Sequence, residues 1–125
     1  MTRIYTLVNQ KGGVGKTTTA INLGAYLAKL DQRVLIVDID PQANATSSLG
    51  VEKNSVSTST YDALLSGDVP ASSILFNERL QLSLLPSSPA LAGAEVELVE
   101  EEGREFRLRD ALESFKGKYD YILID

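Results

Sequence analysis

The sequence predicts an α/β fold in which a mostly parallel β-sheet lies between two layers of helices. The first observation is a strand–helix–strand unit, in which an apolar run at 4–8 and a second one at 34–37 flank helical spacing over 16–30. The second is that the run VLIV at 34–37 is continuously apolar, as in parallel strands covered on both faces. Parallel neighbours joined in this way need a crossover connection, which is almost always right-handed.

Length and composition restrict the possible functions. The chain has 125 residues, which corresponds to one domain at most, and its 43% apolar and 23% charged residues are typical of a globular protein. It contains no cysteine and no histidine. Disulfides, thiolate or histidine metal sites and Ser-His-Asp chemistry are therefore excluded within this sequence.

The charge is uneven along the chain. The net charge is −5, with +2 in residues 1–50 and −7 in residues 51–125, so no basic nucleic-acid footprint is present. No apolar run has the length of a membrane span, and the opening 1–11 is too short and too polar for a signal peptide. We expect a cytoplasmic protein with no membrane contact.

The remaining elements follow from periodicity and from turn residues. Apolar residues at spacings of three and four, Ile21, Leu23, Leu27 and Leu30, support the helix at 16–30. Further along, we expect a turn at 31–32, a loop at 53–60, a helix at 61–65 capped by Thr60 and stopped by Gly67, a strand at 80–85, helices at 90–101 and 104–115, a turn at 116–118 and a strand at 121–124.

The strongest motif is KGGVGKTT, from Lys11 to Thr18, placed between the first strand and the first helix. Glycines let consecutive backbone N–H groups turn inward, and these amides together with the helix N-terminus bind phosphate oxygens. This is the setting of a P-loop, in which Lys16 reaches the β- and γ-phosphates and the Thr17 hydroxyl faces Mg²⁺. The predicted nucleotide-binding residues are Lys11, Gly12, Gly13, Val14, Gly15, Lys16, Thr17 and Thr18. The competing interpretation is a glycine turn before a capped helix, but six specified positions recur by chance only about once in 10⁷ starts.

Two acids follow the second strand in the segment Asp38-Ile39-Asp40-Pro41. Alternation places Asp38 and Asp40 on one side, near the carboxyl ends of the strands where open α/β sheets bind ligands. One carboxylate can support a metal ion and the other can orient or deprotonate an attacking water. A pair of acids in a strand-end turn is the structural alternative.

The run YILI at 121–124 ends on Asp125, which is a Walker B pattern. Its carboxylate would hold Mg²⁺ opposite Thr17. The candidate metal-side groups are therefore Thr17, Asp38, Asp40 and Asp125, whereas Asp120 is expected to be a turn residue. Because the strand stops on its carboxylate without a following turn, we expect residues 1–125 to be the N-terminal part of a single, longer P-loop ATPase domain.

The motif departs from the general P-loop, because Gln10 stands where a glycine is usual and Lys11 precedes the glycine pair. This deviant loop, together with VDIDPQANAT and YDYILID, resembles the ParA/MinD superfamily of Walker-type ATPases. LPSSPALAGAEVELV, residues 85–99, is similar to a further, less specific family segment. The residues Asn9-Gln10 and Pro41-Gln42 are closer to the ParA/Soj partition branch than to the MinD branch.

The resemblance implies a P-loop NTPase fold with three layers, α/β/α, cut after the Walker B strand. It implies a weak ATPase using ATP and Mg²⁺ that dimerises on ATP, with Lys11 reaching the partner's nucleotide and Gly12 and Gly13 permitting close approach. Lys11, Lys16 and Asp40 would carry catalysis, with Asp40 activating water, Asp38 on the metal side and 38–47 acting as a switch. The family also implies a ParB-type partner, and nonspecific DNA binding through parts outside this sequence.

Two other functions stay open. A MinD-like membrane-associated ATPase would need an amphipathic C-terminal helix, and a nucleotide-dependent binding module would have lost hydrolysis. A nitrogenase-reductase-like carrier would need cysteines. In the family sheet, later strands cover one side of the first strand, so we expect that side to be an open edge here.

Overall fold

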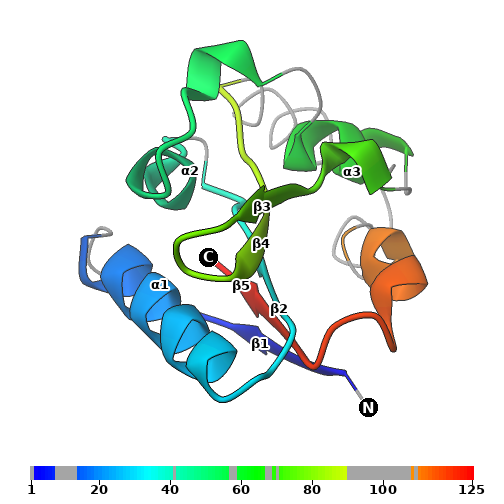
Figure 1. The fold of residues 1–125 in the computed structure, drawn as a ribbon. Helices are drawn as coiled ribbons and strands as arrows, with labels where there is room; N and C mark the ends of the chain where they lie inside the picture. Colours follow the sequence, from blue (N-terminus) through cyan, green and yellow to red (C-terminus); the bar gives the residue numbers. More distant parts are fainter. Residues whose placement is uncertain are drawn as a thin grey trace.

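The computed structural model describes residues 2–7, 14–40, 42–56, 59–66, 69, 71–89, 108 and 110–125. Its centre is a five-stranded sheet with the order β1-β5-β2-β4-β3 (Figure 1). All neighbours are parallel except β3 and β4, which are antiparallel. The strands are β1 (Arg3–Thr6), β2 (Val34–Val37), β3 (Leu75–Asn77), β4 (Leu82–Leu85) and β5 (Tyr121–Ile124).

Helices lie on both faces of the sheet, so the predicted α/β architecture with a mostly parallel sheet is confirmed (Figure 1). One face carries α1 (Val14–Lys29) and α2 (Asn44–Ser48). The other carries α3 (Thr60–Ser66) and a helical turn at 110–112 that continues into η3 (Glu113–Phe115). Two further 3₁₀ turns are η1 (Lys53–Ser55) and η2 (Ala71–Ser73).

The strands β2, β4 and β5 bury side chains on both faces because helices cover both, whereas β1 and β3 are largely exposed. In β2, Val34 and Ile36 pack toward α1 and α2, whereas Leu35 and Val37 pack toward α3 and the 110–115 segment. All four of these side chains are buried, as the continuous apolar run predicts. The alternation in β4 and β5 follows the same rule.

The observed element bounds differ from the expected ones by a few residues. Helix α1 begins at Val14 rather than at 16 and ends at Lys29, and the described part of the first strand is 3–6, with residue 8 outside the described residues. Thr60 is the first residue of α3 rather than its cap, because the Ser59 hydroxyl accepts from the Tyr61 N–H. Gly67, the helix at 90–101 and most of 104–109 lie outside the described residues.

Two elements were missed, and the loop expected at 53–60 contains the turn η1. The strand expected at 80–85 is β4, but it is preceded by the antiparallel strand β3, which a tight turn at 78–81 joins to it. Helix α2 overlaps the end of the segment 38–47 that is expected to be a switch. Both elements have only three to five residues, too few for a periodic signal.

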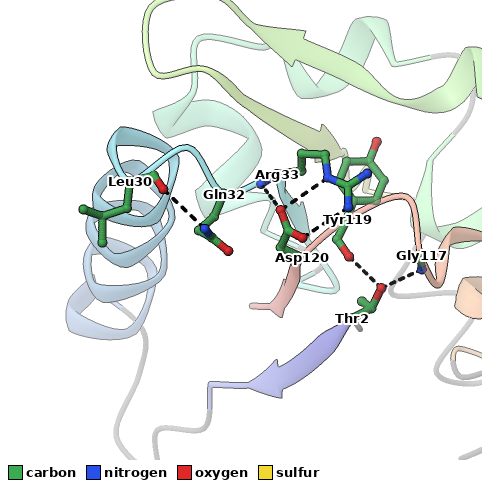
Figure 2. A network of polar contacts seen from close by, with 7 residues as sticks. All are labelled: Thr2, Leu30, Gln32, Arg33, Gly117, Tyr119 and Asp120. Carbon is green, nitrogen blue, oxygen red and sulfur yellow. Dashed lines mark hydrogen bonds and ion pairs between the residues drawn. The ribbon is translucent and has the colours of Figure 1, made fainter.

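The amino ends of β1, β2 and β5 are tied together by polar contacts (Figure 2). Asp120 lies in the expected bend and accepts from the Arg33 N–H at 2.7 Å and from the Arg33 guanidinium at 3.2 and 3.3 Å. Hydrogen bonding from Arg33 lowers the pKa of the Asp120 carboxyl. The Thr2 hydroxyl donates to the Tyr119 carbonyl and accepts from the Gly117 N–H, which fixes the start of β1.

The sheet ends in β1, which pairs only with β5 among the described residues, so the open edge stays a prediction with which this strand order agrees. Two apolar side chains in this strand, Ile4 and Tyr5, are exposed, and so are Leu23 and Tyr26 on α1 and Leu30 directly after it. The spacing of three places Leu23 and Tyr26 on a common helix face. An unpaired edge beside exposed apolar side chains is a site where another strand can pair.

Helix α1 packs closely on the sheet at Gly24, and this contact generates a prediction. A Cβ built there would lie 3.3 Å from Ile36 Cδ1 and 3.4 Å from Leu82 Cδ2. Gly24→Ala should change the free energy of unfolding by less than about 1 kcal/mol, because the helix-propensity gain offsets the crowding. Gly24→Leu should destabilise by about 2–3 kcal/mol through overpacking. Urea denaturation measures both; equal stability of Gly24→Leu and the exposed-site control Asn22→Leu would contradict the close packing.

Candidate functional site

The candidate site lies at the carboxyl ends of β2 and β5, which are adjacent and parallel. The Asp125 N–H donates to the Val37 carbonyl and the Ile39 N–H donates to the Asp125 carbonyl, each at 2.8 Å. The ladder therefore continues one step beyond both strands and holds Asp38 and Asp125 side by side at this edge. Both acids are buried.

Thr17 connects the first turn of α1 to the end of β5. Its hydroxyl donates to Asp125 Oδ2 at 3.0 Å, and both residues are buried although they are 108 positions apart in the sequence. Helix α1 directly follows the glycine-rich stretch, so this bond fixes the position of the helix start relative to the sheet. The structure thus brings together the hydroxyl of the KTT motif and the carboxylate of the Walker B pattern.

Asp38 is fully buried and its carboxylate turns toward α2. Asp38 Oδ2 accepts from the Thr46 hydroxyl at 2.7 Å and from the Thr46 N–H at 2.8 Å, and Oδ1 accepts from the Asp40 N–H at 3.0 Å. Burial raises the pKa of the Asp38 carboxyl to about 6, partly offset by the Thr46 and Asp40 hydrogen bonds, and the charge of Asp125 contributes to the increase. Desolvation dominates because burial disfavours the charged form.

Asp40 is half-buried and organises the turn that leads into α2. Its Oδ1 accepts from the Gln42 N–H at 3.0 Å, and its Oδ2 accepts from the Asn44 side-chain amide at 2.7 Å and from the Asn44 N–H at 3.4 Å. The two acids therefore have different environments, with Asp38 packed inward and Asp40 at the surface of the same turn. The alternative interpretation as strand-end turn acids describes part of this geometry for Asp40.

Several predicted residues cannot be placed. Lys11, Gly12 and Gly13 lie outside the described residues, and so do the side chains of Val14 and Lys16. Gly15 and Thr18 are exposed in the first turns of α1, and a Cβ built on Gly15 would meet no atom within 4 Å. The assignments of these residues to phosphate binding stay predictions.

The oxygen ligands at this site suit an Mg²⁺ ion that is coordinated jointly by the protein and a bound phosphate, rather than by protein groups alone. The hydroxyl of Thr17 and the carboxylates of Asp38 and Asp125 are hard oxygen ligands, which Mg²⁺ prefers. Within the described ranges, no three carboxylates converge tightly enough to hold a metal ion, so Asp40 does not complete such a cluster. Mg²⁺ usually binds one or two protein groups plus phosphate oxygens and waters, which is the combination that these residues offer.

Two residues with a part in this site were not singled out from the sequence, Thr46 and Ser87. The Thr46 hydroxyl donates to Asp38 and also accepts from the Ser87 N–H at 2.9 Å. The signal that could have found them was a polar residue in a segment that follows an apolar strand. Sequence periodicity gives no information on such tertiary hydrogen bonds.

A cavity of about 420 Å³ lies away from this site, beside the amino ends of β2 and β4, with Arg33, Phe76 and Ser83 in its lining. We locate the functional site from the converging polar groups rather than from this cavity, because residues 11–13 of the glycine-rich motif are not among the described residues.

Among known protein families, the AAA domain family matches residues 2–125 of the chain. The chain belongs to the AAA domain family. Its matched span includes the KTT helix start, the two acids after β2 and Asp125, which the structure gathers at one edge of the sheet. No helix in the described part of this AAA domain is long and apolar enough to cross a bilayer.

The named relatives of this AAA domain include a chromosome partitioning protein and a sporulation initiation inhibitor. The chain is 53% identical over 124 residues to the chromosome partitioning protein ParA of Myxococcus xanthus, covering 98% of this chain and 44% of that protein. It is 52% identical over 125 residues to the sporulation initiation inhibitor protein Soj of Bacillus subtilis, covering 100% and 49%. The resemblance to ParA/Soj-type ATPases is confirmed, and the chain spans about half the length of these relatives.

Solved structures agree on the fold and include nucleotide complexes. Cobyrinic acid a,c-diamide synthase from Mycobacterium smegmatis with bound ADP and magnesium has a TM-score of 0.94 and 41% identity, covering 100% of this chain and 51% of that chain. The same synthase with a bound ATP analog and magnesium gives the same TM-score at 40% identity. Nucleotide and Mg²⁺ binding therefore occurs on this fold.

The Thr46 hydroxyl, which contacts both Asp38 and Ser87, leads to a prediction about stability. Thr46→Val should destabilise the protein by about 2–3 kcal/mol, because the Asp38 carboxylate loses a donor and the buried Ser87 N–H loses its acceptor. Thr46→Ser keeps the hydroxyl and should cost only about 1 kcal/mol for the lost methyl group. Chemical denaturation compares the two; equal losses would show that the hydroxyl contributes nothing.

The raised pKa of Asp38 predicts a pH dependence in protein free of Mg²⁺ and nucleotide. The folded-state pKa is about 6 and the ordinary value is 3.8. Between these values the folded state binds more protons than the unfolded state, so the contribution of Asp38 to stability falls as pH rises. The stability of the parent minus that of Asp38→Asn should decrease by up to about 3 kcal/mol from pH 4 to pH 7. A constant difference across this range would disprove the shift.

Proposed function

We propose that the protein carrying this chain is a ParA-type ATPase switch, which binds ATP with Mg²⁺, hydrolyses it slowly and dimerises in the ATP state. The observation that supports this most is the buried Thr17–Asp125 hydrogen bond, which joins the helix after the glycine-rich stretch to the Walker B carboxylate. Family membership and relatives named as partition proteins support it further.

In phosphoryl transfer, one group of residues would bind the phosphates and Mg²⁺, and another would activate the attacking water. The backbone amides of 12–15 and the start of α1 would bind phosphate oxygens, and Lys16 would add a charge at the β- and γ-phosphates. Thr17 and Asp125, with Asp38 beside them, would hold Mg²⁺, which when bound neutralises charge developing on the phosphates. Lys11 would serve the nucleotide of the partner subunit in a dimer.

Asp40 is the residue we assign to water activation. Its carboxylate is half-buried and held by donors in its own turn, so its orientation is fixed while it keeps contact with solvent. A carboxylate placed at the strand ends beside the phosphate loop can orient an attacking water for in-line attack. Asp38 lacks this access because it is fully buried.

The wider role rests on relatives about twice as long as this chain. By analogy with proteins named ParA and Soj, the protein would act in the segregation of chromosomal or plasmid DNA, in the cytoplasm at the nucleoid. It would bind DNA nonspecifically through parts beyond residue 125, and a ParB-type partner would stimulate hydrolysis. The acidic balance of residues 51–125 agrees with DNA contacts elsewhere.

Two alternatives have distinguishable outcomes. A nucleotide-dependent binding module would show Mg-ATP binding with turnover at buffer background. A MinD-like ATPase would be stimulated by anionic lipid vesicles rather than by DNA. The solved structures quoted above are of a synthase at 41% and 40% identity, whereas the chromosome partitioning protein ParA of Myxococcus xanthus is 53% identical to this chain.

The assignment of Asp40 predicts the behaviour of Asp40→Ala in the full-length protein. Hydrolysis should fall by about 100-fold or more, because positioned acid–base groups contribute about 10²–10⁴ in rate. ATP affinity should stay within a few-fold, and the variant should accumulate as an ATP-bound dimer, seen by size-exclusion chromatography with light scattering. Glu78→Ala, at an exposed turn, is the control. Parental turnover in Asp40→Ala would refute the assignment.

A further inference from the structure

We infer that Ser87 is a positioning residue that locks the Asp40 turn onto the end of β4 and so aims the Asp40 carboxylate. This inference rests on the proposed function, because it concerns the same reaction. Ser87 follows β4 and Pro86, and it is fully buried. Neither the family comparison nor the motifs assign it a role.

Ser87 makes two hydrogen bonds to the segment that follows β2. Its hydroxyl donates to the Asp40 carbonyl at 2.6 Å, and its N–H donates to the Thr46 hydroxyl at 2.9 Å. These contacts bridge 47 and 41 positions in the sequence. One residue therefore holds both the start of the turn and the threonine that donates to Asp38.

The other hydrogen bonds of Asp40 are local, so they shape the turn without placing it on the sheet. The Asp40 carbonyl also accepts from the Ala43 N–H, and the carboxylate accepts from Gln42 and Asn44. The Asp40 N–H donates to Asp38, two residues away. The Ser87 hydroxyl is the long-range tie among these contacts, and it acts on the backbone of the residue whose carboxylate would orient water.

The turn needs such a tie because its backbone is strained. Ala43 has φ 56°, in the left-handed region that residues with a Cβ rarely adopt. A strained conformation persists only when surrounding contacts over-determine it. Loss of the Ser87 bond should therefore let the turn relax and misdirect Asp40, while the phosphate-binding residues on α1 stay in place.

The neighbouring serine provides a matched control. Ser88 is also buried, but its hydroxyl lies 3.1 Å from the Ser59 hydroxyl, directly before α3, and makes no hydrogen bond to the described residues of the Asp40 turn. Ser87→Ala and Ser88→Ala each remove one buried hydroxyl from adjacent positions. Only the first removes a contact to Asp40.

The test is Mg-ATP hydrolysis by the full-length protein with kcat and KM measured separately. Ser87→Ala should lower kcat about tenfold and leave KM within twofold, because an interaction that matters only in the transition state affects kcat. Ser88→Ala should keep both values near the parent. Equal effects of the two substitutions would overturn the inference.

A double substitution separates positioning from a general structural role. In the Asp40→Ala background there is no carboxylate to aim, so adding Ser87→Ala should not lower the residual rate further. The same tenfold loss in that background would overturn the inference. Thermal denaturation and binding of a fluorescent ATP analogue confirm that each variant is folded. If Ser87→Ala does not fold, Ser87→Cys, which keeps a weak donor of similar size, should give a smaller kcat loss with KM unchanged; parental kcat would overturn the inference.

Failure of the proposed function has a different signature. If the parent protein hydrolyses Mg-ATP no faster than Lys16→Ala, the ATPase assignment fails and the inference fails with it. If the parent hydrolyses ATP and Asp40→Ala does not, but Ser87→Ala behaves like Ser88→Ala, only the positioning role of Ser87 is refuted.

Discussion

The arrangement of this site depends on one constraint, which is that two carboxylates are buried at the ends of adjacent parallel strands. Asp38 and Asp125 lie side by side because β2 and β5 are in register, and the ladder continues through Ile39 and Asp125. Burying a charged group is costly unless donors satisfy it. The threonines Thr17 and Thr46 supply such donors, so the acids determine which helices must approach this edge.

Each donor brings a helix to the site. Thr17 donates from the first turn of α1, which positions the helix start that follows the glycine-rich stretch. Thr46 donates from α2 through both its N–H and its hydroxyl, which fixes this short helix against the end of β2. A five-residue helix has little stability of its own, so α2 exists because of these tertiary contacts. The Ser87 N–H then joins the end of β4 to the same threonine.

The sequence predicted the elements that have a regular apolar pattern and the acids at the strand ends. It did not predict the residues whose role depends on a contact with a distant part of the chain. The continuous apolar runs of β2 and β5 and the helical spacing of α1 identify these elements, and the acids at the strand ends follow from them. Helix α2 and strand β3 were missed because neither is long enough to show a period. Thr46 in α2 and Ser87 after β4 were missed because a single hydroxyl residue gives the same local sequence pattern whether it faces solvent or a buried polar group. The left-handed backbone at Ala43 is likewise set by tertiary contacts, since alanine has no local preference for it.

Two aspartates that are two positions apart acquire different properties from their surroundings. Asp38 directly follows β2 and is buried. Burial raises the pKa of its carboxyl, and the Thr46 hydroxyl donates a hydrogen bond to it. The chain then turns, so Asp40 lies at the rim of the site with donors from its own turn and with access to water. A carboxylate that acts on water needs solvent access and a fixed orientation. The hydrogen bonds within the Asp40 turn fix the shape of the turn, but not its orientation relative to the sheet. The direction comes from the tie to β4, because Ser87 holds the Asp40 carbonyl against a strand of the sheet. In the proposed function, the inner acid would support the metal ion and the outer one would activate water, as environments elsewhere separate paired carboxylates into different roles.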